Sequence, residues 1–376
     1  MKYKALKDIA TITMGQSPDS SSYNEEENGI PFYQGNADFG ELYPIARVWC
    51  DAPKKTAKEG DILISVRAPI GALNYATEEC CIGRGLAAIT IENETERNYV
   101  FHLLKARNKE LNNKGTGSTF KAIGKSVLED VQVPVISAEQ QELSMKLIDM
   151  IEQIVRQRKQ ELVALDDLIK ARFVEMFGDP IKNPKGWEVV TIGDVVTEVR
   201  YGTSKPAVEG GKYPYLRMNN LTVDGHLDLN DLKYIDISDD EIEKCVVRKG
   251  DVLFNRTNSI ELVGKTAVFD LSEDMVIAGY IIRVRLNERL LPEILSQYMN
   301  LEALKDILRS MAKGAVNQAN INAQELQNIK VYVPDMELQK QFIEIKDQVN
   351  KSKVAVQKAL DETQILFDSL MQKYFG

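Results

Sequence analysis

Residues 168–178 read LIKARFVEMFG, and residues 366–376 read LFDSLMQKYFG. The two stretches lie 198 residues apart (366 − 168), and this offset also aligns residues 123–178 with residues 321–376 without a gap. Self-similarity at a fixed offset is the mark of an internally repeated architecture. The last part of the first half of the chain is therefore repeated at the end of the second half.

Looser echoes join the earlier parts of the two halves. The stretch LKDIATITMGQS from Leu6 resembles IGDVVTEVRYGTS from Ile192, and GDILISVRAPIG from Gly60 resembles GDVLFNRTNSIELVG from Gly250. The echoes occur in the same order in both halves. The sequence therefore predicts a two-fold internal repeat over nearly the whole chain.

Composition sets limits on the class of protein. The 376 residues are 44% hydrophobic and 27% charged, which is ordinary for a globular protein. No apolar run is long enough to span a membrane, and MKYKALKDIA is not a signal peptide, so we expect a cytoplasmic protein. The four cysteines form no CxxC pair, which favours reduced thiols. The net charge of −9 argues against a non-specific nucleic-acid coat but allows a basic face.

Along the chain, segments typical of α+β domains alternate with segments typical of long helices. Residues 1–136 and 181–334 combine short β-branched runs with helical stretches, so each is predicted to be an α+β domain. Residues 137–180 and 335–376 are predicted to be long helices. The first is expected to begin with a capping box at Ser137 and Gln140 and to end at Gly178.

Each long helix carries one apolar stripe with 4-3 spacing between charged faces. At about 1.5 Å per residue, each helix is a rod of ~60 Å. We expect the two stripes to pack against each other as an antiparallel pair in one chain; the alternative is pairing between two copies. The predicted packing residues are Leu147, Ile151, Ile154, Leu162, Leu165, Leu168, Phe342, Ile345, Val349, Val356, Leu360, Leu366 and Leu370.

The sequence offers few of the residue patterns that build catalytic sites. The only histidines, His102 and His226, have no second candidate ligand near them in sequence, so neither a catalytic triad nor a zinc site is predicted. The sequence contains neither a GxxxxGK[ST] loop nor a GxGxxG motif after a strand. We therefore predict a protein that binds and positions, with no catalytic residues, no metal and no cofactor of its own.

Polar and basic residues gather in similar loops of both halves. The candidate DNA-binding residues of the first half are Gln34, Asn36, Ser65, Arg67, Arg84, Lys114, Ser118, Thr119 and Lys121. Those of the second half are Arg217, Asn219, Asn220, Asn255, Arg256, Thr257, Asn258, Lys313, Asn317 and Gln318. Arginine reads guanine and Asn or Gln reads adenine, while Lys and glycine-rich loops hold phosphates.

Any one of these residues could equally cap a turn or lie in a solvated loop. The prediction rests on recurrence, because three similar loops follow in the same order in both halves. The matching loops carry different residues, such as SVRAP in one half and NRTNS in the other. Two similar frames with different side chains suggest two different DNA half-sites.

The ordered set of motifs resembles the specificity subunits of type I restriction–modification systems. The residues that carry the resemblance are VQVPVISAEQQELSMKLI with ARFVEMFGDP, IKVYVPDMELQKQFIEI with MQKYFG, the GDILIS and GDVLFN strands, and the GSTFKAI and VNQANIN segments. The resemblance covers essentially the whole chain. One departure is that Pro134 lies two residues before the position that matches Pro334.

The resemblance implies a function in phage defence and DNA methylation. Each α+β domain would be a target recognition domain that reads one half of a bipartite, asymmetric double-stranded DNA sequence, and the helices would set the spacer. The chain would bind two adenine-N6 methyltransferase subunits and motor–nuclease restriction subunits. S-adenosylmethionine, ATP and Mg would be bound by those partners, and the isolated chain would bind DNA weakly. The alternatives are a specificity subunit of a related methyltransferase–nuclease system and a coiled-coil scaffold that binds no DNA.

Overall fold

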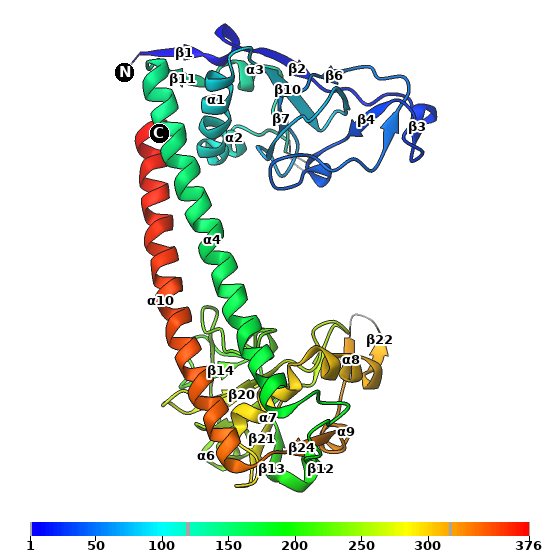
Figure 1. The fold of residues 1–376 in the computed structure, drawn as a ribbon, viewed down its shortest axis with the longest axis vertical. Helices are drawn as coiled ribbons and strands as arrows, with labels where there is room; N and C mark the ends of the chain where they lie inside the picture. The colour runs from blue at the N-terminus through cyan, green and yellow to red at the C-terminus, as the bar shows by residue number, and fades with distance from the viewer. Residues whose placement is uncertain (1, 118–120, 316–317, 376) are drawn as a thin grey trace. The chain divides into compact units, whose positions relative to one another are not determined.

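The computed structural model describes residues 2–117, 121–315 and 318–375. The chain folds as two compact units, of which the first comprises Met1–Arg158 with Ala359–Gly376 and the second comprises Lys159–Lys358. Each unit contains one α+β globular part and portions of both long helices (Figure 1). The compact units therefore cut across the helices, whereas the boundaries predicted from the sequence separate helices from domains.

The two long helices are α4 (Ala138–Phe177) and α10 (Met336–Phe375), with 40 residues each. In the first unit, Ile148 near the start of α4 shares a hydrophobic core with Met371 near the end of α10. In the second unit, Phe173 near the end of α4 lies edge-on to Phe342 near the start of α10, with ring centroids 5.2 Å apart. The helices therefore run antiparallel within one chain, as predicted (Figure 1).

Polar side chains fix where each long helix begins. The Ser137 and Gln140 side chains each accept a hydrogen bond from the other residue's backbone N–H, both at 3.2 Å, which is the predicted capping box. In α10 the fully buried Gln339 donates to the carbonyls of Arg289 (3.0 Å) and Pro334 (2.8 Å). Its side-chain oxygen accepts the Leu291 N–H at 2.9 Å. Gln339 thus fastens the first turn of α10 to the globular part of the second unit.

The repeated ending has a packing explanation. Phe177 and Phe375 are both fully buried, and each lies in the hydrophobic core of its own unit. The Phe375 ring lies 5.1 Å from that of Tyr99, while the Phe177 carbonyl accepts the indole N–H of Trp187 at 2.8 Å. Gly178 follows with φ +88°, a left-handed conformation that ends α4. Each helix therefore ends by anchoring an aromatic side chain in a globular core.

Most of the predicted apolar stripe packs as expected, with two corrections. Leu168 and Leu366 are 43% and 51% exposed, and the neighbouring Ile169 and Phe367 face the cores instead. A strict 4-3 repeat drifts around a helix of 3.6 residues per turn, so a step of four from Leu165 selects Ile169. The buried members of the predicted set are Ile151, Phe342, Val349 and Leu360. The half-buried members are Leu147, Ile154, Leu162, Leu165, Ile345, Val356 and Leu370.

Within the described residues, the globular part of the first unit contains three sheets and three α-helices. A four-stranded antiparallel sheet has the order β2 (Thr11–Met14), β10 (Leu86–Thr90), β7 (Ile62–Ser65) and β8 (Leu73–Tyr75). A five-stranded sheet has the order β3 (Tyr23–Asn24), β5 (Trp49–Cys50), β4 (Ile30–Tyr33), β9 (Cys80–Ile82) and β6 (Thr56–Ala57). The remaining elements are β1 (Tyr3–Ala5) paired with β11 (Gln132–Pro134), α1 (Glu94–Ala106), α2 (Asn108–Asn113) and α3 (Lys125–Glu129).

The globular part of the second unit repeats this plan. Its antiparallel sheet has the order β13 (Val196–Tyr201), β21 (Ile281–Leu286), β17 (Val252–Asn255) and β19 (Thr266–Val268). A second sheet has the order β15 (Lys233–Ile235), β14 (Tyr213–Leu216), β20 (Met275–Ile277) and β16 (Val246–Val247). The other strands are β12 (Glu188–Thr191) paired with β24 (Lys330–Val333), and β18 (Thr257–Asn258), β23 (Gln318–Asn320) and β22 (Lys313–Ala315). The helices are α5 (Ile192–Val195), α6 (Asp239–Cys245), α7 (Pro292–Met299), α8 (Glu302–Met311) and α9 (Ala323–Gln327).

The two units therefore match strand for strand in their central sheets. The order β2-β10-β7-β8 corresponds to β13-β21-β17-β19, and every neighbouring pair in both sheets is antiparallel. The echo seen in the sequence at Gly60 and Gly250 precedes β7 and β17, which occupy equivalent places in these sheets. The α+β repeat predicted from the sequence is confirmed.

Two further properties bear on the predicted setting of the protein. None of the helices in the described ranges combines the length and the apolar character needed to cross a bilayer. The four cysteines, Cys50, Cys80, Cys81 and Cys245, are buried and unpaired. Burial raises the pKa of the Cys80 thiol to about 12, so this thiol is a poor nucleophile at neutral pH.

Candidate DNA interface

Four loops of the first unit meet at one edge of its sheets. The N–H of Val66, just after β7, donates to the Gly85 carbonyl (2.9 Å), and the Val66 carbonyl accepts the Ile123 N–H (2.9 Å). The Gly83 N–H donates to the Tyr33 carbonyl at the end of β4 (2.8 Å). These bonds bring together the loops around residues 34–36, 66–69, 83–85 and 121–123. Loops far apart in sequence thus form one surface, which we call the first reading edge.

Side chains suited to nucleic acid are exposed on the first reading edge. Gln34, Arg67, Arg84 and Lys121 are exposed, and Asn36 is half-buried. Within the described ranges, Arg67, Arg84 and Lys121 take part in no ion pair, so their charges are available to phosphates or bases. Positive charges without internal partners are the groups that release counterions when they contact DNA.

Lys114 differs from these cations because it already has an anionic partner. It is exposed and pairs with Glu110 at 2.7 Å, one helical turn away. A contact between Lys114 and a phosphate would compete with this surface ion pair, which is worth less than about 1 kcal/mol. Lys114 therefore remains a weaker candidate than Arg67 or Arg84.

The second unit builds the same edge with the same backbone bonds. The Arg256 N–H, just after β17, donates to the Tyr280 carbonyl (2.9 Å), and the Arg256 carbonyl accepts the Ile321 N–H (2.9 Å). These contacts repeat those of Val66 with Gly85 and Ile123. We call the surface formed by the loops around residues 201–203, 217–219, 256–258, 279–280 and 318–321 the second reading edge.

A second pair of matching bonds holds the glycine after the first strand of each sheet. The Gly15 N–H donates to the Leu86 carbonyl (2.9 Å), and the Gly202 N–H donates to the Ile281 carbonyl (3.1 Å). A Cβ added at either glycine would lie 2.1–2.2 Å from a carbonyl oxygen, so only glycine allows this close approach of backbones. The frame of the reading edge is therefore the same in both units.

The side chains on the second reading edge differ from those on the first. The Arg256 guanidinium lies 5.0 Å above the ring centroid of Tyr201, and Tyr201 and Tyr280 are 43% and 50% exposed. Asn219 and Gln318 are exposed. Arg217 and Lys313 are not free cations, because they pair with Asp231 (2.8 Å) and Glu325 (2.5 Å).

Four predicted DNA-binding residues are corrected by the structure, because their polar atoms are buried and used internally. The Ser65 hydroxyl donates to the Pro69 carbonyl at 2.7 Å. The Asn220 amide donates to the Asp228 carbonyl at 2.8 Å, and the Asn255 amide donates to the Tyr280 carbonyl at 3.2 Å. The Thr257 hydroxyl donates to Asn320 at 3.2 Å. These side chains build the loops of the reading edges and do not face outward.

Asn258 also uses its side chain within its own loop. Asn258 is half-buried, and its amide donates to the side-chain oxygen of Asn255 at 2.9 Å. Ser118, Thr119 and Asn317 lie outside the residues that the structure describes. The sequence prediction therefore did not separate the side chains that hold a loop from those that face outward, and DNA contact by the exposed residues stays a prediction.

Tyr201 and Tyr280 are interface candidates that the sequence prediction missed. Tyrosine is a common core residue, so neither was singled out as a contact residue. The signal was present in the echo TMGQS and RYGTS, which places Tyr201 directly before the glycine that the reading-edge frame requires. Tyr280 is the residue whose carbonyl holds Arg256, and its counterpart in the first unit is Gly85.

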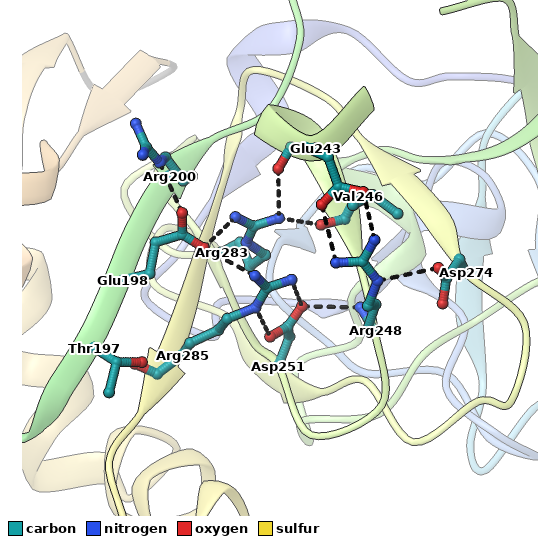
Figure 2. Close-up of polar contacts among 10 residues, drawn as sticks. All are labelled: Thr197, Glu198, Arg200, Glu243, Val246, Arg248, Asp251, Asp274, Arg283 and Arg285. Atoms are coloured by element: carbon teal, nitrogen blue, oxygen red, sulfur yellow. Dashed lines mark hydrogen bonds and ion pairs between the residues drawn. The ribbon is translucent and has the colours of Figure 1, made fainter. Parts of the chain in front are cut away.

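A buried charged network stabilises the strands behind the second reading edge (Figure 2). Arg283 of β21 is fully buried, donates to Glu198 of β13 at 2.6 Å, and also donates to the Val246 carbonyl. Arg285 bridges Glu198 (3.0 Å) and Asp251 (2.8 Å). The network ties β13 and β21 to the start of β17. Tyr201 ends β13, Arg256 directly follows β17, and Tyr280 directly precedes β21.

One cluster of potential metal ligands exists within the described parts of the chain. The ligand atoms of Asp166, Asp224 and His226 all lie within 4.8 Å of one another. The expectation that His226 has no candidate ligand near it in sequence was wrong, because Asp224 lies two residues before it; only Asp166 is distant in sequence. Lys353 already pairs with Asp166, which opposes the binding of a cation there. Burial lowers the pKa of His226. The prediction that the chain holds no metal stays a prediction.

The comparison with known families agrees with the duplicated architecture. The family described as type I restriction modification DNA specificity domain matches residues 1–164 and 184–363. The MjaX specificity subunit of Methanocaldococcus jannaschii is 42% identical over 151 residues, which are 40% of this chain and 36% of that relative. The EcoKI specificity subunit of Escherichia coli is 22% identical over 358 residues, which are 86% of this chain and 77% of that relative. The alignment with MjaX thus spans little more than a third of that relative.

The fold is shared with solved structures at low sequence identity. The S subunit of a type I restriction–modification system from M. genitalium has a TM-score of 0.55 at 14% identity, covering 100% of this chain and 96% of that one. A structure of a type I restriction–modification complex gives a TM-score of 0.64 at 19% identity, with coverage of 100% and 97%. The family match spans both repeats, so the chain belongs to the family of type I restriction–modification DNA specificity domains.

Proposed function

We propose that the chain is the non-catalytic DNA-recognition subunit of a type I restriction–modification enzyme. The observation that carries the proposal is the duplicated reading edge, in which the same backbone bonds present different side chains. Direct readout requires side chains that vary on a rigid backbone, because each base pair displays a different pattern of donors and acceptors. Two edges of this kind favour a bipartite, asymmetric DNA target, with one half-site for each unit.

The charges on the two edges support a division between positioning and reading. Arg67, Arg84 and Lys121, which form no ion pair with any residue that the structure describes, suit phosphate and guanine contacts, and Gln34 suits adenine. The net charge of −9 disfavours tight non-specific binding by the chain alone. We therefore expect the isolated chain to bind DNA weakly and the assembled enzyme to bind its target at ~10⁻⁸ M or tighter.

In this proposal, partner subunits catalyse the methylation and restriction reactions. Two adenine-N6 methyltransferase subunits would bind S-adenosylmethionine and flip the target adenine, and motor–nuclease subunits would use ATP and Mg. The relatives named above as specificity subunits, and the solved structure concerned with complex assembly, support partners of this kind. The 40-residue helices α4 and α10, each ~60 Å long, would set the spacing between half-sites.

The test is methylome sequencing of cells that contain the methyltransferase with and without this chain. We expect N6-methyladenine in a split, asymmetric motif only when the chain is present. Methylation that is unchanged by the chain would contradict the proposal and favour a scaffold that binds no DNA. A restriction assay in the same cells distinguishes a related methyltransferase–nuclease system, because such a system would cut unmethylated DNA without a separate motor–nuclease subunit.

A further inference from the structure

Arg256 differs from every other arginine of the second unit. That unit contains nine arginines, and within the described ranges eight of them form ion pairs with carboxylates. The eight are Arg172, Arg200, Arg217, Arg248, Arg283, Arg285, Arg289 and Arg309. Arg256 alone has no carboxylate partner there, and its Nε is buried without a hydrogen-bond partner. A half-buried guanidinium without an anionic partner keeps N–H donors that a bound ligand can use.

The backbone of Arg256 is held on both sides. Its N–H donates to the Tyr280 carbonyl and its carbonyl accepts the Ile321 N–H, both at 2.9 Å. Because Arg256 directly follows β17 (Val252–Asn255), its Cα is fixed relative to the central sheet. The position of the side chain on the second reading edge therefore depends little on loop motion.

The side chain of Arg256 is also oriented by an aromatic platform. Its guanidinium carbon lies 5.0 Å from the ring centroid of Tyr201. The Tyr201 backbone pairs with Ile282 in β21, and its hydroxyl accepts the Ala323 N–H at 2.8 Å. The ring is thus fixed at both ends, by a strand and by the start of α9. This cation–π contact with a fixed ring favours one position of the guanidinium and so limits the orientations of its donor fork.

We propose, on the basis of the proposed DNA-recognition function, that Arg256 reads a guanine in the half-site of the second unit and that Tyr201 is its positioning residue. A planar fork held in one orientation can donate two hydrogen bonds to guanine O6 and N7, and no other base offers two acceptors there. A phosphate would be neutralised equally well by a flexible lysine. The stacking by Tyr201 therefore adds orientation, which a base contact needs and a simple charge contact does not.

The test uses the full chain in complex with its methyltransferase and compares methylated motifs for a series of variants. With Arg256→Gln, one G·C pair of one half-site is expected to become degenerate, with a loss of discrimination of about 5- to 150-fold at that position, as for one bidentate pair. Arg256→Lys keeps the charge but not the fork, so it is expected to retain methylation and lose the same discrimination. Arg289→Gln is the matched control, because Arg289 is an exposed arginine paired with Glu188.

Two variants of Tyr201 test the positioning role. Tyr201→Phe keeps the ring and is expected to retain the guanine preference, whereas Tyr201→Leu removes the stacked ring and should relax the same base pair as Arg256→Gln. A merely structural role would lower methylation at all positions without selecting one base pair. Thermal unfolding of each variant shows whether it is folded.

Three results would overturn the inference while leaving the proposed function intact. They are a wild-type half-site of the second unit that contains no G·C pair, an Arg256→Gln motif identical to that of the wild type, and full discrimination by Arg256→Lys. Failure of the proposed function is distinguishable, because the wild-type complex would then produce no defined motif.

Discussion

The central sheets of the two units share one strand order but differ in the residues at their centre. In the first unit, Ala88 of β10 lies between Leu63 of β7 and Thr13 of β2. In the second unit the equivalent residue of β21 is Arg283, between Leu253 of β17 and Arg200 of β13. An apolar centre in one unit is thus replaced by a network of arginines and carboxylates in the other (Figure 2).

This difference shows that the backbone frame does not depend on one particular interior. Asp61 and Asp251 precede β7 and β17, and both are buried carboxylates that accept a backbone N–H three residues earlier. Only Asp251 also has a guanidinium partner, Arg285. Interior and reading edge therefore differ between the units while the frame of hydrogen bonds stays the same, as the proposed reading of two different half-sites would require.

The largest expected effect follows from removing Arg283. Arg283→Ala leaves the Val246 carbonyl without its donor and Glu198 without its most buried partner. The free energy of unfolding of the second unit should therefore fall by about 3 kcal/mol or more. Arg283→Met should cost much less, because an apolar chain of similar length needs no partner. Trp187 lies in the second unit and Trp49 in the first, so backgrounds that keep a single tryptophan (Trp49→Phe or Trp187→Phe) let fluorescence during urea unfolding report each unit separately. A loss below 1 kcal/mol for Arg283→Ala would mean that the network contributes little.

A comparable effect is expected from the two terminal phenylalanines, but in different units. Phe177→Ala should destabilise the second unit and Phe375→Ala the first, each by about 3–5 kcal/mol, because both rings are fully buried. In each case the transition reported by the tryptophan of the affected unit should shift more than the other. If Phe375→Ala shifted only the Trp187 transition, the assignment of the end of α10 to the first unit would be wrong.

A moderate effect is expected from acid. The hydrogen bond from Arg200 and the charges of Arg283 and Arg285 hold the pKa of Glu198 below its ordinary value of 4.5, against the opposing effect of burial. A carboxylate with a depressed folded-state pKa stabilises the fold above its unfolded pKa, and this stabilisation is lost as the pH falls through the folded value. The stability difference between wild type and Glu198→Gln should therefore be constant above pH ~5.5 and shrink below about 4.5. A difference that grows on acidification would contradict this account.

The smallest effect concerns the helix stripe. Leu168→Ala should change stability by less than about 0.5 kcal/mol because Leu168 is 43% exposed, whereas Ile169→Ala should cost about 2–4 kcal/mol. Urea unfolding read through Trp187 measures both. A cost for Leu168→Ala as large as that for Ile169→Ala, or larger, would contradict the burial of Ile169 in place of Leu168.

Sequence alone predicted the repeat, the two long helices and the loops that form the reading edges. These features follow from local signals, such as the capping box at Ser137 and the glycine at 178, or from the constant offset between the halves. It could not predict which polar side chains turn inward, because Ser65 and Asn255 look like binding residues until their carbonyl partners are known. Nor could it predict the buried Arg283, whose partners lie on other strands.

The central claim is that the two reading edges act independently on two half-sites. The most direct measurement is the methylated motif of cells that carry the methyltransferase with either Arg67→Ala/Arg84→Ala or Arg256→Gln versions of this chain. We predict that the first set changes only one half of the motif, that Arg256→Gln changes only the other, and that the spacer is constant. If both sets altered the same half, or weakened both halves alike, the account of two independent readers on one duplicated frame would be contradicted.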